Sequence, residues 1–159
     1  MATIKSLTGA GWLKDADDNF AAVNAELAYS SGFHITKFTF DTAANDATSP
    51  TPVSNKTVAA HPMAVSIPAK AIVISGHVDV IAAVTSGGSA TVAIGLVSGT
   101  DLLVATAVTS LGLAAQLPMA AVIAAPIKLT AEKAVTVTVG TAALTAGKID
   151  GYIIWMEGA

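Results

Sequence analysis

The residues whose types and spacing come closest to a metal site lie near the N-terminus. Acid or amide side chains fall at positions one, three, five and twelve of a run, the ligand spacing of an EF-hand loop: Asp15, Asp17, Asn19 and Glu26. Phe20 stands at position six, where the sharp turn of that loop needs glycine. A continuous helix would also separate the first and last of these residues by about 16 Å along its axis. We interpret the run as the acidic start of a helix, and no metal or cofactor is expected.

The histidines do not have the spacing of a metal site. His34, His61 and His77 form neither an HxH nor an HxxxH pair, and no HExxH motif occurs. The alternative is a shared site in which symmetric copies of one histidine meet on the axis of a trimer. We interpret all three as ordinary surface or partly buried histidines.

No nucleophile–base constellation can be identified. His77 and Asp79 share one face of an expected strand and could act as an acid–base pair, but no nucleophile accompanies them. Gly147-Lys148 is followed by Ile149 where a phosphate-binding loop has Ser or Thr, and no GxSxG motif is present. The sequence therefore predicts a protein that is not an enzyme, with no catalytic residue.

Aromatic side chains are the other route to a binding site, because sugar-binding faces usually stack aromatic rings on the sugar. The candidates are Trp12, Tyr29, Tyr152 and Trp155. Trp155 alternates with Ile153, which favours a place in the core.

Charge is scarce and is unevenly distributed. All eight basic residues are Lys, they are scattered singly, and the net charge is −3, so no nucleic-acid partner is expected. There is no cysteine, and hence neither a disulfide framework nor a thiolate metal site. Charged residues make up 12% of the chain against roughly 25% in typical soluble domains. Between Val80 and Ile127 only Asp101 is charged, so we expect other subunits to cover part of the surface.

The apolar stretch from Leu102 to Ile127 exceeds the roughly 20 residues that a membrane-spanning helix needs. Pro118, Pro126 and several polar residues interrupt it, so no membrane span is expected. The N-terminus lacks the apolar core of a signal peptide, so the protein is expected to start out in the cytosol.

A polar connection and the strand patterns that follow it divide the chain into an N-terminal arm over residues 1–57 and a β-sandwich domain over residues 58–159. In the arm, Phe20, Val23 and Leu27 form a narrow apolar stripe that predicts a short helix over residues 15–30. A strand is expected over 34–40, with Phe38 and Phe40 on one face. Residues 41–56 are a connection rich in Pro, Ser, Thr and Asn.

Strand patterns dominate the domain. The expected strands and turns are 63–67; 71–84 with a bulge at Gly76; a glycine hairpin at 86–89; 90–97; a turn at 98–101; 102–111 as strand or short helix; and 121–125. The closing strands alternate, with Val135, Val137 and Val139 on one face, and a turn is expected at 145–147 before Ile149–Trp155. The fold class is mainly β, an antiparallel β-sandwich or jelly roll with an N-terminal arm that contains a short helix.

Residues 78–111 and 126–155, less than half of the chain, resemble small structural proteins of tailed bacteriophages. The shared elements are a Gly-Gly turn leading into ATVAIG, a Gly-Thr-Asp turn, and LTAGKI before a final aromatic-bearing strand. The resemblance implies a β-sandwich or jelly-roll body. It also implies oligomers, often trimers, on the outside of the virion as capsid decoration, cement or head-fibre components.

The main hypothesis is a non-enzymatic virion structural protein, a capsid decoration or cement protein that stabilises the shell as a homotrimer bound to the major capsid protein or other virion proteins. The alternative is a tail or fibre domain that binds host-surface glycan, which would need exposed aromatic side chains and a groove.

Overall fold

The computed structural model describes residues 32–48, 50–120 and 125–158. Chain contacts divide the protein into two units, residues 1–32 and 33–159, and the description below concerns the second. The expected helix over 15–30 lies outside the described residues, together with the acidic run Asp15–Glu26, Trp12 and Tyr29. Most of the strand expected at 121–125 also lies outside them.

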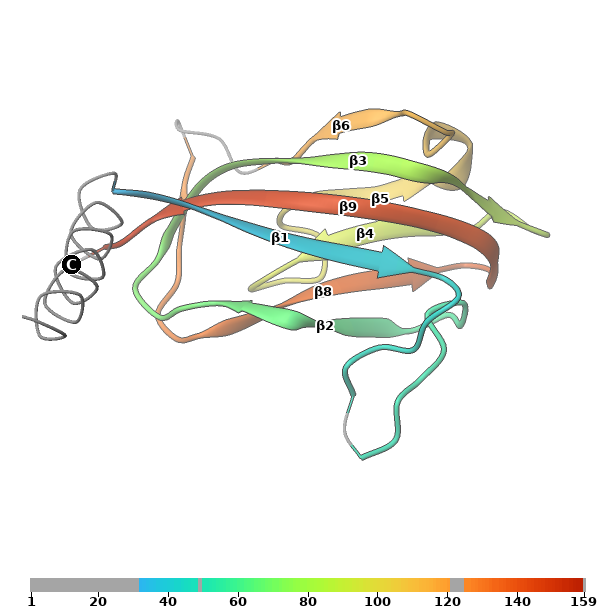
Figure 1. Ribbon diagram of the computed structural model, residues 1–159, viewed down its shortest axis with the longest axis horizontal. Helices are drawn as coiled ribbons and strands as arrows, with labels where there is room; N and C mark the ends of the chain where they lie inside the picture. The colour runs from blue at the N-terminus through green and yellow to red at the C-terminus, as the bar shows by residue number, and fades with distance from the viewer. Residues whose placement is uncertain (1–31, 49, 121–124, 159) are drawn as a thin grey trace, which may run out of the picture. The chain divides into compact units, whose positions relative to one another are not determined.

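Two antiparallel sheets make up this unit (Figure 1). The five-stranded sheet has the order β1 (Phe33–Asp41), β9 (Leu144–Met156), β3 (Ile72–Ser86) and β6 (Gln116–Pro118), and the short β7 (Ile127–Lys128) also pairs with β3. The four-stranded sheet has the order β2 (Ala60–Ile67), β8 (Lys133–Gly140), β4 (Thr91–Gly95) and β5 (Leu103–Ala107). A 3-10 helix, η1 (Val108–Ser110), follows β5.

The strand order is that of a jelly roll. β4 pairs with β5, β3 with β6, β2 with β8, and β1 with β9, so that the pairings are nested around the β4–β5 turn. A chain folded back on itself in this way and then wound into two facing sheets gives the eight-stranded double-sheet architecture. The predicted fold class, an antiparallel β-sandwich or jelly roll, is confirmed for the described residues.

The core lies between the two sheets and is built by alternation along the strands. Val135, Val137 and Val139 of β8 are fully buried, as their spacing predicts. On β9 the buried set includes Ile149 and Ile153, also as predicted. Two sheets whose inner faces alternate in this way bury a continuous apolar layer, which is the main source of stability in a sandwich.

β1 is part of the five-stranded sheet. It pairs with β9 in unbroken register from Phe33↔Met156 to Asp41↔Lys148. Phe38 and Phe40 point inward, and Ile35 points outward, as the alternation predicts. The long connection after β1 returns to β2 through a loop closed by the Asn45↔Ser54 bridge.

Two turns differ from their predictions. Ser86–Ser89 does not close a hairpin, because β3 and β4 belong to different sheets and the segment crosses between them. The turn before the last strand lies at residues 141–143, where Thr141 has a φ of 69°, and not at 145–147. Gly147 is inside β9 with a φ of 143°, and a Cβ there would lie 2.8 Å from the Cα of Val84. Of these glycines, Gly147 has a positive φ, whereas Gly87 and Gly88 do not.

The bulges of β3 are not at Gly76, contrary to the prediction. Gly76 pairs in register with Ile153, whereas the register shifts leave Ile74 and Ile81 as extra residues on β3. Glycine is needed at position 76 for close packing, because a Cβ would lie 2.5 Å from the sulfur of Met119.

The stretch 102–111, predicted as strand or short helix, contains both β5 and η1. The predicted turn at residues 98–101 is also present. The Asp101 carboxylate accepts hydrogen bonds from the backbone N–H groups of Leu96, Val97 and Ser98, at 2.7, 2.8 and 3.2 Å.

Candidate interaction surfaces and polar sites

The outer face of the five-stranded sheet carries a polar row at its centre. Lys37 of β1 lies 2.7 Å from Asp150 of β9, and the Thr39 hydroxyl donates to the same carboxylate at 2.6 Å. Burial raises the pKa of Asp150, but the hydrogen bonds from Lys37 and Thr39 outweigh it and the pKa is lowered. The hydrogen bond to Asp150 raises the pKa of Lys37. This carboxylate is therefore held as an ion that joins two strands, which suits structure and not proton transfer.

His77 and Asp79 occupy one face of β3, as the sequence predicts, but they do not form a pair with each other. The His77 ring stacks on Tyr152 at 4.9 Å between centroids, and the Lys37 ammonium lies 5.5 Å from the centre of the same tyrosine ring. Asp79 lies opposite Asp150 in the sheet register. His77 and its neighbours thus form a packed cross-strand cluster.

Trp155 is buried, as its alternation with Ile153 predicts. Its indole N–H donates to the Thr36 hydroxyl at 2.9 Å, and the His34 ring stacks on it at 4.2 Å. Because Trp155 is covered and one ring face of Tyr152 is occupied by His77, these two described candidates do not form an open platform on which a sugar could stack.

The three histidines lie on three strands, His34 on β1, His61 on β2 and His77 on β3. Across residues 32–48, 50–120 and 125–158, no group of three or more His, Cys, Asp or Glu side chains has a geometry that could hold a metal ion.

The most deeply buried polar cluster surrounds His61 and was not predicted. His61 is fully buried; its Nδ1 lies 3.1 Å from Asp46 Oδ2 and its Nε2 lies 2.9 Å from the carbonyl oxygen of Thr57. The Thr57 carbonyl can only accept, so Nε2 donates that hydrogen bond, and Nδ1 faces the Asp46 carboxylate. His61 therefore binds two separate parts of the β1–β2 connection.

Asp46 is held as a carboxylate by the loop that it organises. Burial raises its pKa, but backbone N–H groups of Val53 and Thr48, each 3.0 Å from Oδ1, and the contact with His61 lower it to about 2. The cluster ties the β1–β2 connection to β2. The one sequence signal for it was the Asp-x-Thr order of residues 46–48, which is typical of an Asx turn.

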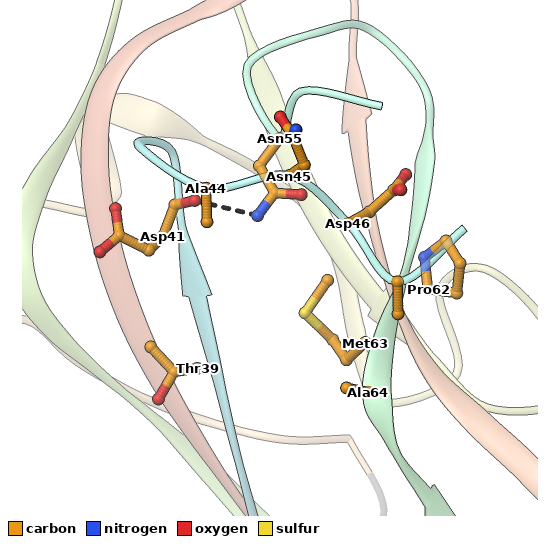
Figure 2. Close-up of a pocket in the computed structure, with 10 residues that line it drawn as sticks. Thr39, Asp41, Ala44, Asn45, Asp46, Asn55, Pro62, Met63 and Ala64 are labelled. Atoms are coloured by element: carbon orange, nitrogen blue, oxygen red, sulfur yellow. Dashed lines mark hydrogen bonds between the residues drawn. The ribbon is translucent and has the colours of Figure 1, made fainter. Parts of the chain in front are cut away.

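A pocket of about 320 Å³ adjoins this cluster, and Figure 2 shows the side chains that line it. Its walls come from β1, from the β1–β2 connection and from the start of β2. The Asn55 side-chain N–H donates to the Asp41 carbonyl at 2.9 Å, whereas the buried Asn55 Oδ1 has no hydrogen-bond partner. The Asp41 carboxylate lies 3.4 Å from the Lys148 ammonium, outside the pocket. The pocket therefore lies where the β1–β2 connection packs against the sheet. Its lining does not contain a nucleophile next to a base.

Most of the described residues 102–120 are exposed, and none of them is charged. Val104 is 62% exposed and Leu113 is 71% exposed, and neither has a charged side chain near it in the sequence except Asp101, whose carboxylate serves the turn before β5. Exposed contiguous apolar surface marks interaction sites in folded proteins. Among the described helices, none is long and apolar enough to cross a bilayer.

Searches of known proteins and structures give a likeness of fold. No protein-family profile and no curated protein matches this sequence. A chain in the cyanophage Pam1 capsid asymmetric unit is similar with a TM-score of 0.56 and 16% sequence identity, covering 79% of this chain and 84% of that chain.

Two other phage capsid structures contain similar chains. One is the acidic stable capsid of Helicobacter pylori bacteriophage KHP30, with a TM-score of 0.53, 15% identity, and coverage of 80% of this chain and 89% of that chain. The other is the capsid of Ralstonia phage GP4, with a TM-score of 0.53, 16% identity, and coverage of 79% and 86%. The described unit thus shares its fold with chains from three phage capsids.

Proposed function

We propose that this protein is a structural component of a tailed-bacteriophage virion and does no catalysis. The observation that carries the proposal is an exposed, uncharged strand surface on a jelly roll whose fold recurs in chains of three phage capsid structures. The side chains that could do chemistry support it as well. In the described part of the chain, the buried His61–Asp46 pair and the Lys37–Asp150 pair both serve to join segments of the fold.

Within the virion, we propose a capsid decoration or cement protein that associates as a homotrimer and binds the major capsid protein. Apolar surface of about 800 Å² per partner, at about 25 cal/mol per Å², gives a large gross driving force before the ordering costs of association. A trimer that bridges neighbouring capsid subunits adds contacts across seams of the shell.

The proposal is tested with phage shells prepared without this protein. Addition of the purified chain is expected to produce binding that saturates at a fixed ratio to the major capsid protein, and to raise the temperature at which the shell releases its DNA. An unrelated acidic protein at equal concentration serves as the control. Failure to co-sediment with the shell, or binding that leaves the release temperature unchanged, would contradict a cementing role.

A further inference from the structure

The two sides of the sandwich differ in charge, and the difference identifies one of them as a contact surface. Each side is formed by one edge strand from each sheet: β1 and β2 on one side, and β6 and β5 on the other (Figure 1). Open strand edges expose unpaired N–H and C=O groups, and proteins protect them with charges, proline or bulges.

The β1–β2 side carries such protection. Lys37 and Asp41 lie on β1, and β2 contains Pro62. Ser66 of β2 also donates a hydrogen bond to Glu132, so that a carboxylate lies beside this edge. Charges at an open edge disfavour pairing with another chain, because the charges would have to be desolvated.

The opposite side has no charged residue along β5, η1 and β6; Asp79 of β3 lies opposite Gln116, and Lys128 lies on β7, which pairs with the same strand. We define it as the uncharged side: the exposed residues of β5, η1 and the segment that leads through β6 to Ala120. The N–H of Ala120 donates to the Leu102 carbonyl at 2.6 Å, which links the end of β6 to the start of β5. Val80 exchanges two backbone hydrogen bonds of 2.9 Å with Ala114 and Ala115, which joins this segment to β3 next to the exposed residue Ile81.

Two β-bulges increase the apolar area of this side. On β5, Val104 and Ala105 together face the single residue Ala93, because Ile94 pairs with Leu103 and Val92 with Thr106. Both extra residues are exposed. On β3, the register shift between Val80 and Ala82 leaves Ile81 unpaired and 44% exposed. A bulge re-aims a side chain that a regular strand would turn to the other face.

We propose that the uncharged side is the surface through which copies of this chain contact one another, an inference that rests on the proposed homo-oligomer. A charged partner surface would lose its hydration on binding here and would gain no opposite charge in return. The partner that suits this surface is therefore itself uncharged. A second copy supplies such a surface, and closed symmetric homo-oligomers are the commonest assemblies. Around a three-fold axis, the uncharged sides of the copies converge.

Charge insertion tests the surface. Val104→Lys and Leu113→Lys alter the uncharged side, and Val58→Lys is the control because Val58 is 53% exposed and precedes β2 on the other side. Size-exclusion chromatography with light scattering at micromolar concentration should give a multiple of 15.8 kDa for the wild type and for Val58→Lys. Each of the two substitutions on the uncharged side should raise the dissociation constant at least about tenfold, since a buried unpaired charge costs more than 1.4 kcal/mol.

Cross-linking provides a readout that does not depend on dissociation. The chain has no cysteine, so Val104→Cys and Val58→Cys each carry a single thiol. A short bis-maleimide should join copies of Val104→Cys and leave Val58→Cys uncoupled. A wild-type oligomer that survives both lysine substitutions, with no cross-link at position 104, overturns the inference and leaves the oligomer intact. A wild-type monomer overturns the proposed homo-oligomer itself.

Discussion

Asp46 and His61 form a buried side-chain pair, with Nδ1 and Oδ2 3.1 Å apart, in which neither side chain exposes more than 1% of its surface. The pair joins the long β1–β2 connection to the first residues of β2, and each partner has its other polar atoms satisfied by backbone groups. A pair of this kind adds little net stability compared with apolar residues, but the removal of one partner leaves a buried charge unpaired.

His61→Ala should therefore lower the free energy of unfolding by about 3–5 kcal/mol, because it leaves the Asp46 carboxylate buried without its side-chain partner. Chemical denaturation measured by circular dichroism gives the value. Lys148→Ala is the matched control: it removes a cation from the Lys148–Asp41 pair, in which the side chains are 42% and 33% exposed, and should have little effect. Equal losses for the two variants would contradict a special role for the buried pair.

Acid should weaken the fold through Asp46. Its pKa is lowered to about 2 in the folded protein, from 3.8, so the carboxylate contributes stability that is complete above pH 4 and is lost as the pH falls toward 2. Asp150 acts in the same direction, since its pKa is also lowered. Asp46→Asn should remove part of this dependence. Denaturation midpoints of wild type and variant at pH 6, 4 and 2 should converge as the pH falls, and a constant difference would argue against the assignment.

Gly151 has no side chain because the ring of Phe38 occupies that space across the β1–β9 pair. A Cβ at position 151 would overlap the ring, so Gly151→Ala should destabilise the protein by about 1–3 kcal/mol through overpacking. Gly87→Ala is the control, because a Cβ there meets nothing within 4 Å. Thermal unfolding of both variants, and of the double variant Gly151→Ala/Phe38→Leu, separates a clash from a general effect of alanine. Without partial recovery in the double variant, the clash is not the cause.

Asp101 should matter for folding and not for binding. Asp101→Ala leaves the N–H groups of Leu96, Val97 and Ser98 without their acceptor and should reduce the free energy of unfolding by about 1–3 kcal/mol. Asp79→Ala, which removes a carboxylate from the outer face of β3, is the comparison and should change stability by less than about 0.5 kcal/mol. The two values come from the same denaturant titration, and similar values would mean that the turn does not depend on the carboxylate.

The strands and their inward faces followed from the sequence because alternation is a local signal. The buried side chains follow the predicted period of two in three segments: Val135–Val139, Phe38 and Phe40, and Ile149–Trp155. Strand partners did not follow from it, because in a jelly roll they are far apart in the chain. The Gly87–Gly88 pair looks the same in sequence whether it closes a hairpin or crosses between sheets, and only the pairing of β4 with β8 distinguishes them.

The polar sites were predicted less well for the same reason. Asp46 and His61 are fifteen residues apart, and nothing in either local pattern indicates that they meet. His77 and Asp79 share a face, but the partner that defines His77 is Tyr152, on a strand remote in sequence. The shortage of charge between Val80 and Ile127 did indicate an unusual surface, since composition needs no knowledge of pairing.

The most direct test of the proposed virion role is a symmetric reconstruction of phage particles that carry this protein. We predict jelly-roll density on the outer surface of the shell, in three copies around local three-fold positions, with the β5–β6 sides turned toward one another. Particles whose shell carries no such density, or in which the chain is found only on the tail, would contradict the account.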